Sequence, residues 1–275
     1  MRRVVIVLAD GLRPDAITPS RMPSLDALSR EYTVALRART VRPSTTVAAL
    51  TSLATGLAPQ THGFTEPGLA FLSRLAQLKP VARELARAGV PSTIVAHELP
   101  IVERSVVGAL ATAAGIGRLT GRGRTARDIA VAAHEALAAQ QYGVVFAYFN
   151  ECDQAGHRTG WMSNEYLAAA SDIDAGIGML ADLAEDSLFL VLADHGGGGV
   201  NPRDHGEPHP VNDHIPVVLA GPMVTRRHQL TRAVSLLDVP PTLLWWLGVE
   251  IPASYEGRVL SEAFAPVPGA AEVAV

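Results

Sequence analysis

One short stretch, VLADHGGGGVNPRDHG at residues 191–206, carries two Asp-His pairs around a run of glycines. Asp194 and His195 come directly after an apolar run, and a second Asp-His-Gly begins ten residues later at Asp204. Carboxylates and imidazoles both commonly bind divalent metal ions. The stretch therefore indicates a metal site, and further ligands are expected elsewhere in the chain.

Three aspartates each follow a short apolar run in the sequence. Asp10, Asp153 and Asp194 each come at or just beyond the end of a short apolar run. Such runs predict strands that are covered on both faces, and the carboxyl ends of parallel strands meet at the edge of a sheet where ligands bind. Three carboxylates at one edge repel one another unless a cation offsets their charge. We therefore expect a divalent metal there.

Histidines complete the set of candidate ligands. His157 follows Asp153 by four residues, so one turn of chain can direct both side chains at one ion; His195 adjoins Asp194, and His205 lies across the glycine run. Three carboxylates and three imidazoles suffice for two sites with three protein ligands each. Mixed nitrogen and oxygen ligands favour Zn²⁺, with Mn²⁺ or iron as alternatives. Sites with only three protein ligands leave a position open, as in catalytic metal sites.

A candidate nucleophile lies in RPSTTVAALTSLATG, residues 42–56, where Thr45 and Thr46 begin a predicted helix. The start of a helix attracts anions through its free N–H groups and its dipole. A threonine hydroxyl there could coordinate a metal, ionise and attack an electrophile held by the same amides. The alternative is that Thr45 or Ser44 only caps the helix. The nearby metal ligands make us favour the nucleophile.

The remaining pattern predicts the scaffold. Strands are expected over residues 4–9, 33–36, 92–96, 144–149, 188–193 and 215–220. Helices are expected over residues 24–30, 46–55, 81–88, 106–114, 125–139, 164–183 and 235–247, with a flexible basic loop at 117–125. Alternating strands and helices predict an α/β fold, a three-layer α/β/α sandwich with a mostly parallel central sheet. We expect one catalytic domain over residues 1–263 and a flexible tail over 264–275.

Composition narrows the class of protein. The chain has 275 residues, 48% hydrophobic and 18% charged, as in globular proteins, and its net charge of -4 gives no broad basic field for nucleic acid. No apolar stretch is long enough to cross a bilayer. Cys152 is the only cysteine, so nothing argues for an oxidising compartment. A small-molecule partner and a cytoplasmic location are expected, without a nucleic-acid or membrane partner; the sequence does not set the oligomeric state.

Four ordered motifs carry a family resemblance. They are ADGLRPDA at residues 9–16, RPSTTVAALTSLATGLAPQTHG at 42–63, YFNECDQAGH at 148–157 and LADHGGGG at 192–199. Each is weak alone, but in this order they resemble the alkaline phosphatase superfamily, in the branch of type I phosphodiesterases and nucleotide pyrophosphatases. The resemblance implies an alkaline-phosphatase-like fold and extends from residue 5 to about residue 260.

The resemblance also implies a role for each candidate residue. Counting back from Gly56, the family's nucleophile falls on Thr46. One metal would be held by the first aspartate, the Asp-His pair and the nucleophile, and the other by the DxxGH pair and a late histidine. The first set is then Asp10, Thr46, Asp194 and His195, and the second is Asp153, His157 and His205. His209 and His214 stay open as alternatives for the last ligand.

The implied activity is hydrolysis of phosphate esters, with diesters preferred, through a threonine nucleophile and two divalent ions. Departures from the family bear on the substrate: Ala49 stands where nucleotide pyrophosphatases usually have an asparagine, and Thr45 where they have a lysine. The insertions that build a nucleotide pocket are also missing, so a nucleotide substrate is not supported. Alternatives are a phosphomonoesterase or phosphonate hydrolase, and, from another class, a catalytically silent metal-binding protein.

Overall fold

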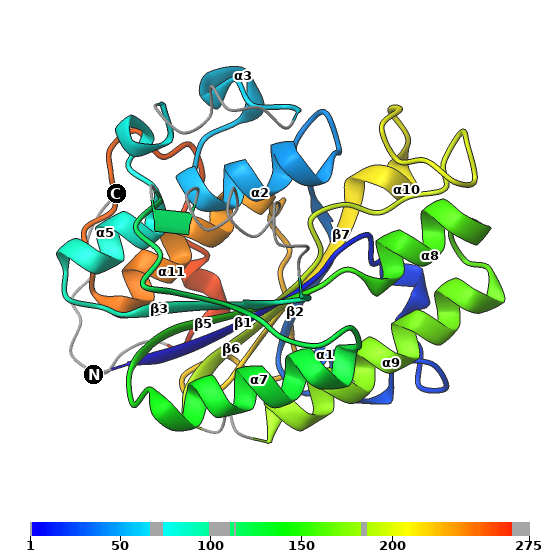
Figure 1. Ribbon diagram of the computed structural model, residues 1–275, viewed down its shortest axis with the longest axis horizontal. Coiled ribbons are helices and arrows are strands. Elements are labelled where there is room, and N and C mark those ends of the chain that lie inside the picture. The colour runs from blue at the N-terminus through cyan, green and yellow to red at the C-terminus, as the bar shows by residue number, and fades with distance from the viewer. Residues whose placement is uncertain (1, 67–73, 99–110, 113, 183–185, 266–275) are drawn as a thin grey trace.

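The computed structural model describes residues 2–66, 74–98, 111–112, 114–182 and 186–265. Within these residues eight strands form one sheet in the order β4-β3-β5-β1-β6-β7-β2-β8. Figure 1 shows α7 and α9 together on one face of this sheet and α2, α5 and α11 on the other. The fold is therefore the three-layer α/β/α sandwich that the alternating pattern predicted.

The strands bring the aspartates to one edge because most of them run in parallel. Their bounds are β1 Arg3–Ala9, β2 Thr33–Arg39, β3 Ser92–Ala96, β4 Arg118–Gly121, β5 Gly143–Phe149, β6 Ser187–Leu192, β7 His214–Ala220 and β8 His228–Gln229. β1 pairs in parallel with both β5 and β6, and β5 pairs in parallel with β3. Of the strands in the described residues, only β7 is antiparallel to its neighbours, β6 and β2. The carboxyl ends of β3, β5, β1 and β6 thus lie side by side.

The helices follow local signals in the sequence. Their bounds are α1 Pro23–Glu31, α2 Thr46–Thr55, α3 Pro59–His62, α5 Val81–Arg87, α7 Ala126–Ala139, α8 Glu151–Thr159, α9 Asn164–Ala181, α10 Pro210–Asp213 and α11 Val239–Leu247. Gly56 ends α2 with a φ of 67°, a left-handed conformation that suits glycine. Thr125 begins α7 through a capping box with Asp128.

The core surrounds the central strand. Val4, Val5, Val7, Leu8 and Ala9 of β1 have no exposed surface, because the strand has a neighbour on either side and helices over both faces. Full burial on both faces explains why this run is continuously apolar instead of alternating. The residue after it, Asp10, is held by a rigid element in the middle of the sheet.

The elements that differ from the sequence expectation include β4 and α8. Residues 118–121, expected within a flexible loop, form the edge strand β4, paired in parallel with β3. Residues 151–159, for which no helix was expected, form α8. The helix expected over 106–114 falls mostly outside the described residues, as does the tail from residue 266. Phe264, the first residue of the tail expected over 264–275, is buried and stacks on Trp246 with ring centroids 5.2 Å apart.

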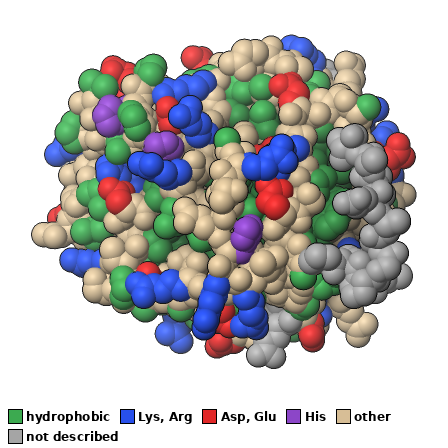
Figure 2. Space-filling view, turned by 180° about the vertical axis from the view of Figure 1, so that it is seen from behind, with side chains coloured by type: hydrophobic (Ala, Val, Ile, Leu, Met, Phe, Trp, Pro, Cys, Tyr) green, Lys and Arg blue, Asp and Glu red, His purple; other side chains and the backbone are tan. Residues whose placement is uncertain are grey.

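The described surface carries mixed charge. On the face drawn in Figure 2, Lys and Arg side chains are scattered among acidic and hydrophobic ones and do not gather into one basic field. Of the helices in the described part of the chain, none combines the length and apolar character that a membrane span requires.

Candidate metal centre

Seven predicted residues, contributed by five places in the fold, lie together at the carboxyl edge of the sheet. Asp10 follows β1, Asp194 and His195 follow β6, Asp153 and His157 lie in α8, His205 lies in the loop before α10, and Thr46 is the first residue of α2. Since α8 is a helix, the four-residue spacing of Asp153 and His157 places both on one side of it.

The first group surrounds the imidazole of His195. Its Nε2 atom lies 3.2 Å from Asp10 Oδ1 and 3.4 Å from Asp194 Oδ2. The hydroxyl Oγ1 of Thr46 lies 3.1 Å from the same nitrogen. Asp194 and His195 are fully buried and Asp10 is nearly so, while Thr46 is half-buried. A hydroxyl, two carboxylates and an imidazole therefore converge on one point.

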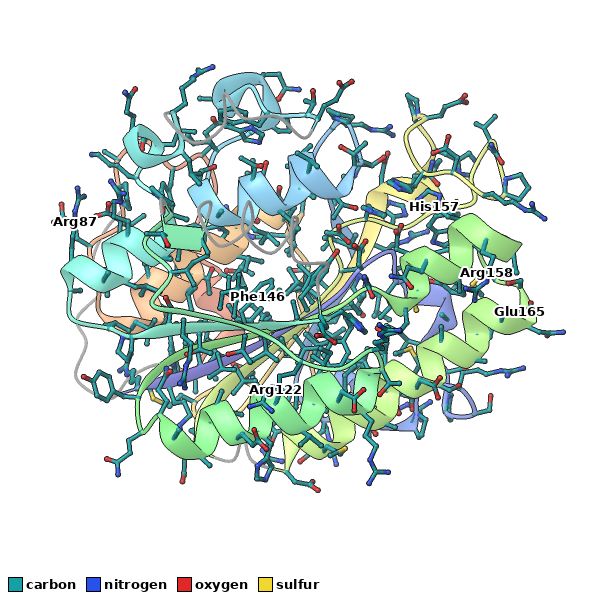
Figure 3. All side chains as sticks on the ribbon, in the orientation of Figure 1. Arg87, Arg122, Phe146, His157, Arg158 and Glu165 are labelled. Atoms are coloured by element: carbon teal, nitrogen blue, oxygen red, sulfur yellow. The ribbon has the colours of Figure 1, made fainter. Side chains whose placement is uncertain are left out.

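The second group surrounds Asp153. Its Oδ1 atom lies 3.4 Å from His157 Nε2 and 3.7 Å from His205 Nε2, and the two imidazole nitrogens are 3.2 Å apart. The same oxygen lies 4.0 Å from His195 Nε2, which joins the two groups. The side chain of His157 is 45% exposed, so solvent reaches the centre from α8, where Figure 3 labels His157 and Arg158.

Backbone carbonyl groups orient all three imidazoles. The Nδ1–H groups of His195, His157 and His205 donate to Gly196 O at 2.8 Å, Arg203 O at 2.9 Å and Ser44 O at 2.6 Å, respectively. With Nδ1 fixed in this way, Nε2 is the atom of each ring that faces the carboxylates and that would coordinate an ion. Metal-binding histidines are commonly oriented by such a hydrogen bond on the opposite ring nitrogen.

One oxygen of each carboxylate faces the centre close to the imidazoles but without a hydrogen bond. Asp10 Oδ1, Asp153 Oδ1 and Asp194 Oδ2 are buried and make no hydrogen bond in the described structure. Burial, followed by the charge of Asp10, raises the pKa of Asp153 to about 6 and the pKa of Asp194 well above its usual value. A divalent cation would satisfy these oxygens and offset their repulsion. Two sets, Asp10–Asp194–His195 and Asp153–His195–His205, have the spacing that one ion requires.

Residues that the sequence reasoning missed hold the carboxylates in place. The phenol of Tyr148, on β5, donates to Asp10 Oδ2. Trp161 Nε1 and Tyr166 OH both donate to the carbonyl oxygen of Gly11 at 2.9 Å, and Gly11 N–H donates to Asp194 Oδ1 at 3.2 Å. Tyr148 stands just before the DxxGH motif, but nothing local in the sequence pairs it with Asp10.

The glycine run makes room for neighbouring residues. A Cβ atom on Gly197 would lie 2.1 Å from the ring of Trp161, and one on Gly198 would lie 2.7 Å from Trp161 Cβ. A Cβ atom on Gly196 would lie 1.9 Å from Val211 O. The glycine run therefore packs closely against Trp161 and α10.

The alternatives for the last histidine lie elsewhere. His209 caps α10, where its Nδ1 accepts from Val211 N–H at 3.3 Å. His214 lies on β7 opposite Arg39. His205 is thus the one of the three that lies beside Asp153.

The neighbours of Thr46 have other partners. Thr45 Oγ1 donates to Thr65 O at 3.4 Å and makes no capping bond, and Ser44 Oγ donates to His205 O at 2.5 Å. Ala49, where the resemblance leads one to expect an amide side chain, is fully buried. The hydroxyl that faces the centre is therefore that of Thr46.

A buried cluster of carboxylates and imidazoles at the carboxyl edge of a mostly parallel sheet defines a metalloenzyme of the alkaline-phosphatase-like fold. The profile of the Metalloenzyme superfamily matches residues 110–251, more than half of the chain, and that of type I phosphodiesterase / nucleotide pyrophosphatase matches residues 4–69. The chain belongs to the Metalloenzyme superfamily, as the ordered motifs indicated, and the expectation of an enzyme of the alkaline phosphatase superfamily is confirmed.

Curated relatives match part of the chain. A 2,3-bisphosphoglycerate-independent phosphoglycerate mutase from Syntrophotalea carbinolica is 33% identical over 132 residues, 46% of this chain and 25% of the mutase. Arylsulfatase K from Canis lupus familiaris is 27% identical over 103 residues, 34% of this chain and 19% of the sulfatase. The chain thus spans about a quarter or less of the length of these relatives.

Solved structures match nearly the whole fold. A phosphonate monoester hydrolase from Silicibacter pomeroyi has a TM-score of 0.70 at 17% identity, over 94% of this chain and 76% of that one. An alkaline phosphatase superfamily protein from Vibrio parahaemolyticus has a TM-score of 0.71 at 19% identity, over 96% and 70%. At these identities the likeness establishes the fold.

Proposed function

We propose that this protein hydrolyses phosphate esters, with diesters preferred, using Thr46 as nucleophile and two divalent metal ions. The observation that carries the proposal is the position of Thr46 Oγ1, which lies 3.1 Å from His195 Nε2, the atom around which buried carboxylate oxygens without a hydrogen bond gather. The matched phosphodiesterase profile covers the segment that contains Thr46.

The residues fit the proposed ions. Asp10, Thr46, Asp194 and His195 would hold one ion, and Asp153, His157 and His205 the other. When bound, the ions supply charge neutralisation for the attacking and leaving oxygens of an in-line displacement. Mixed nitrogen and oxygen ligands make Zn²⁺ our first choice, ahead of Mn²⁺ and iron.

The residues of the chain position the reacting groups. Thr46 begins α2, and the first N–H groups of a helix have no partner within it, so they can hold phosphoryl oxygens beside the hydroxyl. In the proposed reaction Thr46 Oγ1 loses its proton to solvent and bonds to phosphorus while the ester P–O bond breaks, which releases the alcohol. Water then cleaves the phosphothreonine and restores the hydroxyl.

The substrate is proposed to be a small molecule. Ala49 supplies no side-chain amide to a phosphoryl oxygen. This argues against a nucleotide substrate of the kind that the matched family's description names. A phosphomonoesterase or phosphonate hydrolase is the second candidate, favoured by the phosphonate monoester hydrolase among the structural neighbours. A catalytically silent metal-binding protein would have no use for a hydroxyl placed at the centre. The lone, buried Cys152 is consistent with the proposed cytoplasmic location.

The direct test removes the hydroxyl. We expect Thr46→Ala to lower kcat for nitrophenyl phosphate esters by at least about 1000-fold, because the covalent step is lost, while metal content stays near that of the unaltered protein. Thr45→Ala is the matched control, because its hydroxyl bonds to Thr65 O, away from the centre. Parallel assays with mono- and diesters and a phosphonate separate the two candidate activities. Full activity of Thr46→Ala would refute the proposed nucleophile.

A further inference from the structure

The chain that leads into the nucleophile is bonded to the segments that carry metal ligands. We refer to residues 40–46, which run from the end of β2 into the first residue of α2, as the nucleophile segment. Thr40 Oγ1 donates to the carbonyl oxygen of Asp194, and Thr40 N–H donates to Asp213 O at 2.9 Å. The guanidinium of Arg42 pairs with the carboxylate of Asp213. The nucleophile segment is therefore held against the two loops that follow β6 and precede β7.

Ser44, in the same segment, makes two hydrogen bonds with one of the proposed ligands. Its Oγ donates to His205 O at 2.5 Å, and His205 Nδ1 donates to Ser44 O at 2.6 Å. Within the described residues, these are the only hydrogen bonds that join His205 to a residue outside its own loop, apart from the contact of its Nε2 with His157 in the centre. Ser44 is fully buried and His205 is 7% exposed, so loss of the serine hydroxyl would leave a carbonyl group short of a partner. The position of His205 thus depends on Ser44.

The same serine lies two residues before the nucleophile, so it connects the two ligand sets. Thr46 Oγ1 lies 3.1 Å from His195 Nε2, and His205 Nε2 lies 3.7 Å from Asp153 Oδ1. The rings of His195 and His205 stack with centroids 3.8 Å apart. A movement of Ser44 would therefore shift Thr46 and His205 relative to each other within a closely packed centre. Misplacing a reacting group by about 1 Å can lower a rate by about 100-fold.

We propose that Ser44 is a positioning residue, which couples the nucleophile Thr46 to the ligand His205 through this pair of hydrogen bonds. The inference rests on the proposed hydrolysis of phosphate esters. One buried hydroxyl then supports both ligand sets, although Ser44 belongs to neither. Because Ser44 acts through Thr46 and His205, its loss should change turnover and zinc binding, and leave the binding of substrate nearly as it was.

Removing the hydroxyl tests the coupling by kinetics and by zinc binding. We expect Ser44→Ala to lower kcat for phosphate diesters by about 10–100-fold with KM within about twofold, and to weaken the binding of one of two zinc ions by about tenfold or more. Competition with a chromophoric chelator measures the zinc affinities. Ser52→Ala is the matched control, because Ser52 is equally buried and its Oγ lies 3.1 Å from His62 Nε2, outside the centre. This control should lose stability but keep kcat and both zinc affinities.

A second variant keeps the hydroxyl and tests the inference even if Ser44→Ala does not fold. Ser44→Thr retains the donor to His205 O, so its kcat and zinc affinities should stay within about threefold of those of the unaltered protein. A loss of about tenfold or more in Ser44→Thr would show that the hydroxyl is not what the centre requires, and would overturn the inference.

Threonine methyl NMR separates failure of the coupling from failure of the proposed function, because it requires no turnover. In the zinc-loaded protein the Thr46 methyl resonance, assigned by its absence in Thr46→Ser, should be single and sharp. Ser44→Ala should broaden or split it, because the side chain of Thr46 is then less firmly placed, whereas Ser52→Ala should not. A broadened resonance with weaker zinc binding supports the coupling even if no ester is cleaved. An unchanged resonance or unchanged zinc affinities in Ser44→Ala would overturn the inference while leaving the hydrolase in place.

Discussion

Tyr148 donates a hydrogen bond to Oδ2 of Asp10, although 138 residues separate the two in sequence. The bond is possible because β5 and β1 are parallel neighbours, with Tyr148 opposite Leu8. The other oxygen of Asp10 lies 3.2 Å from His195 Nε2. Burial, followed by the charge of Asp10, raises the pKa of Tyr148 well above its usual value, so the phenol keeps its proton. Tyr148 thus fixes which oxygen of Asp10 faces the metal centre.

Replacing Tyr148 should weaken metal binding without unfolding the protein. We expect Tyr148→Phe to lower the affinity for Zn²⁺ by about 10–100-fold, the usual effect of losing a hydrogen bond to a metal ligand. Competition with a chromophoric chelator measures this affinity. Tyr142→Phe, just before the opposite end of β5, is the control and should bind zinc normally. Unchanged affinity in Tyr148→Phe would show that Asp10 does not need this bond.

Adding one methyl group to the glycine run should destabilise the protein. A Cβ atom on Gly197 would lie 2.1 Å from the ring of Trp161, which is buried and also bonded to Gly11 O. We expect Gly197→Ala to lower the free energy of unfolding by about 1–3 kcal/mol through overpacking. In Gly206→Ala the nearest atom, Asp204 Oδ1, is 3.8 Å away, so a smaller loss is expected. Urea denaturation of both variants measures the difference, and equal losses would contradict the packing role.

Acid should destabilise the fold through His62. This side chain is fully buried, its Nε2 lies 3.1 Å from Ser52 Oγ and its Nδ1 accepts from Phe64 N–H at 3.0 Å, which suits the neutral ring. Burial lowers its pKa below the value of about 6.5 that applies in the unfolded chain.

Because the unfolded chain then binds the proton more readily, His62 should reduce stability as pH falls below about 6.5. Thermal unfolding between pH 7.5 and 5.5 tests this expectation. His62→Gln should have a lower melting temperature at pH 7.5 but a smaller decrease on acidification. An identical decrease in both proteins would show that His62 does not contribute to the pH dependence.

The sequence was most informative where local pattern and burial agree. Thr46–Thr55 and Ser92–Ala96 have the bounds predicted for them, because a glycine stop and a continuous apolar run are local signals. Strand β4 was missed because its pairing with β3 is a tertiary effect and its residues are mostly polar. Helix α8 was missed because ECDQAGHRT has no apolar periodicity.

The sequence suggested which residues form the candidate site, but it did not reveal the residues that hold them in place. Spacing within motifs predicted the acids and the histidines, and the family resemblance selected Thr46, yet three histidines stayed open for the last position. Only the path of the loop before α10 brings His205 next to Asp153. Tyr148 and Trp161 act through contacts more than 100 residues away in sequence, so no local pattern reveals them.

The central claim is that seven side chains hold two divalent ions beside the hydroxyl of Thr46. Anomalous diffraction at the zinc edge, from crystals grown with zinc, measures the ion positions directly. The account predicts two peaks with ligand distances of about 2.0–2.2 Å. One peak should touch Asp10, Thr46, Asp194 and His195, and the other Asp153, His157 and His205. Zinc bound elsewhere, or no peak between these side chains, would contradict the account.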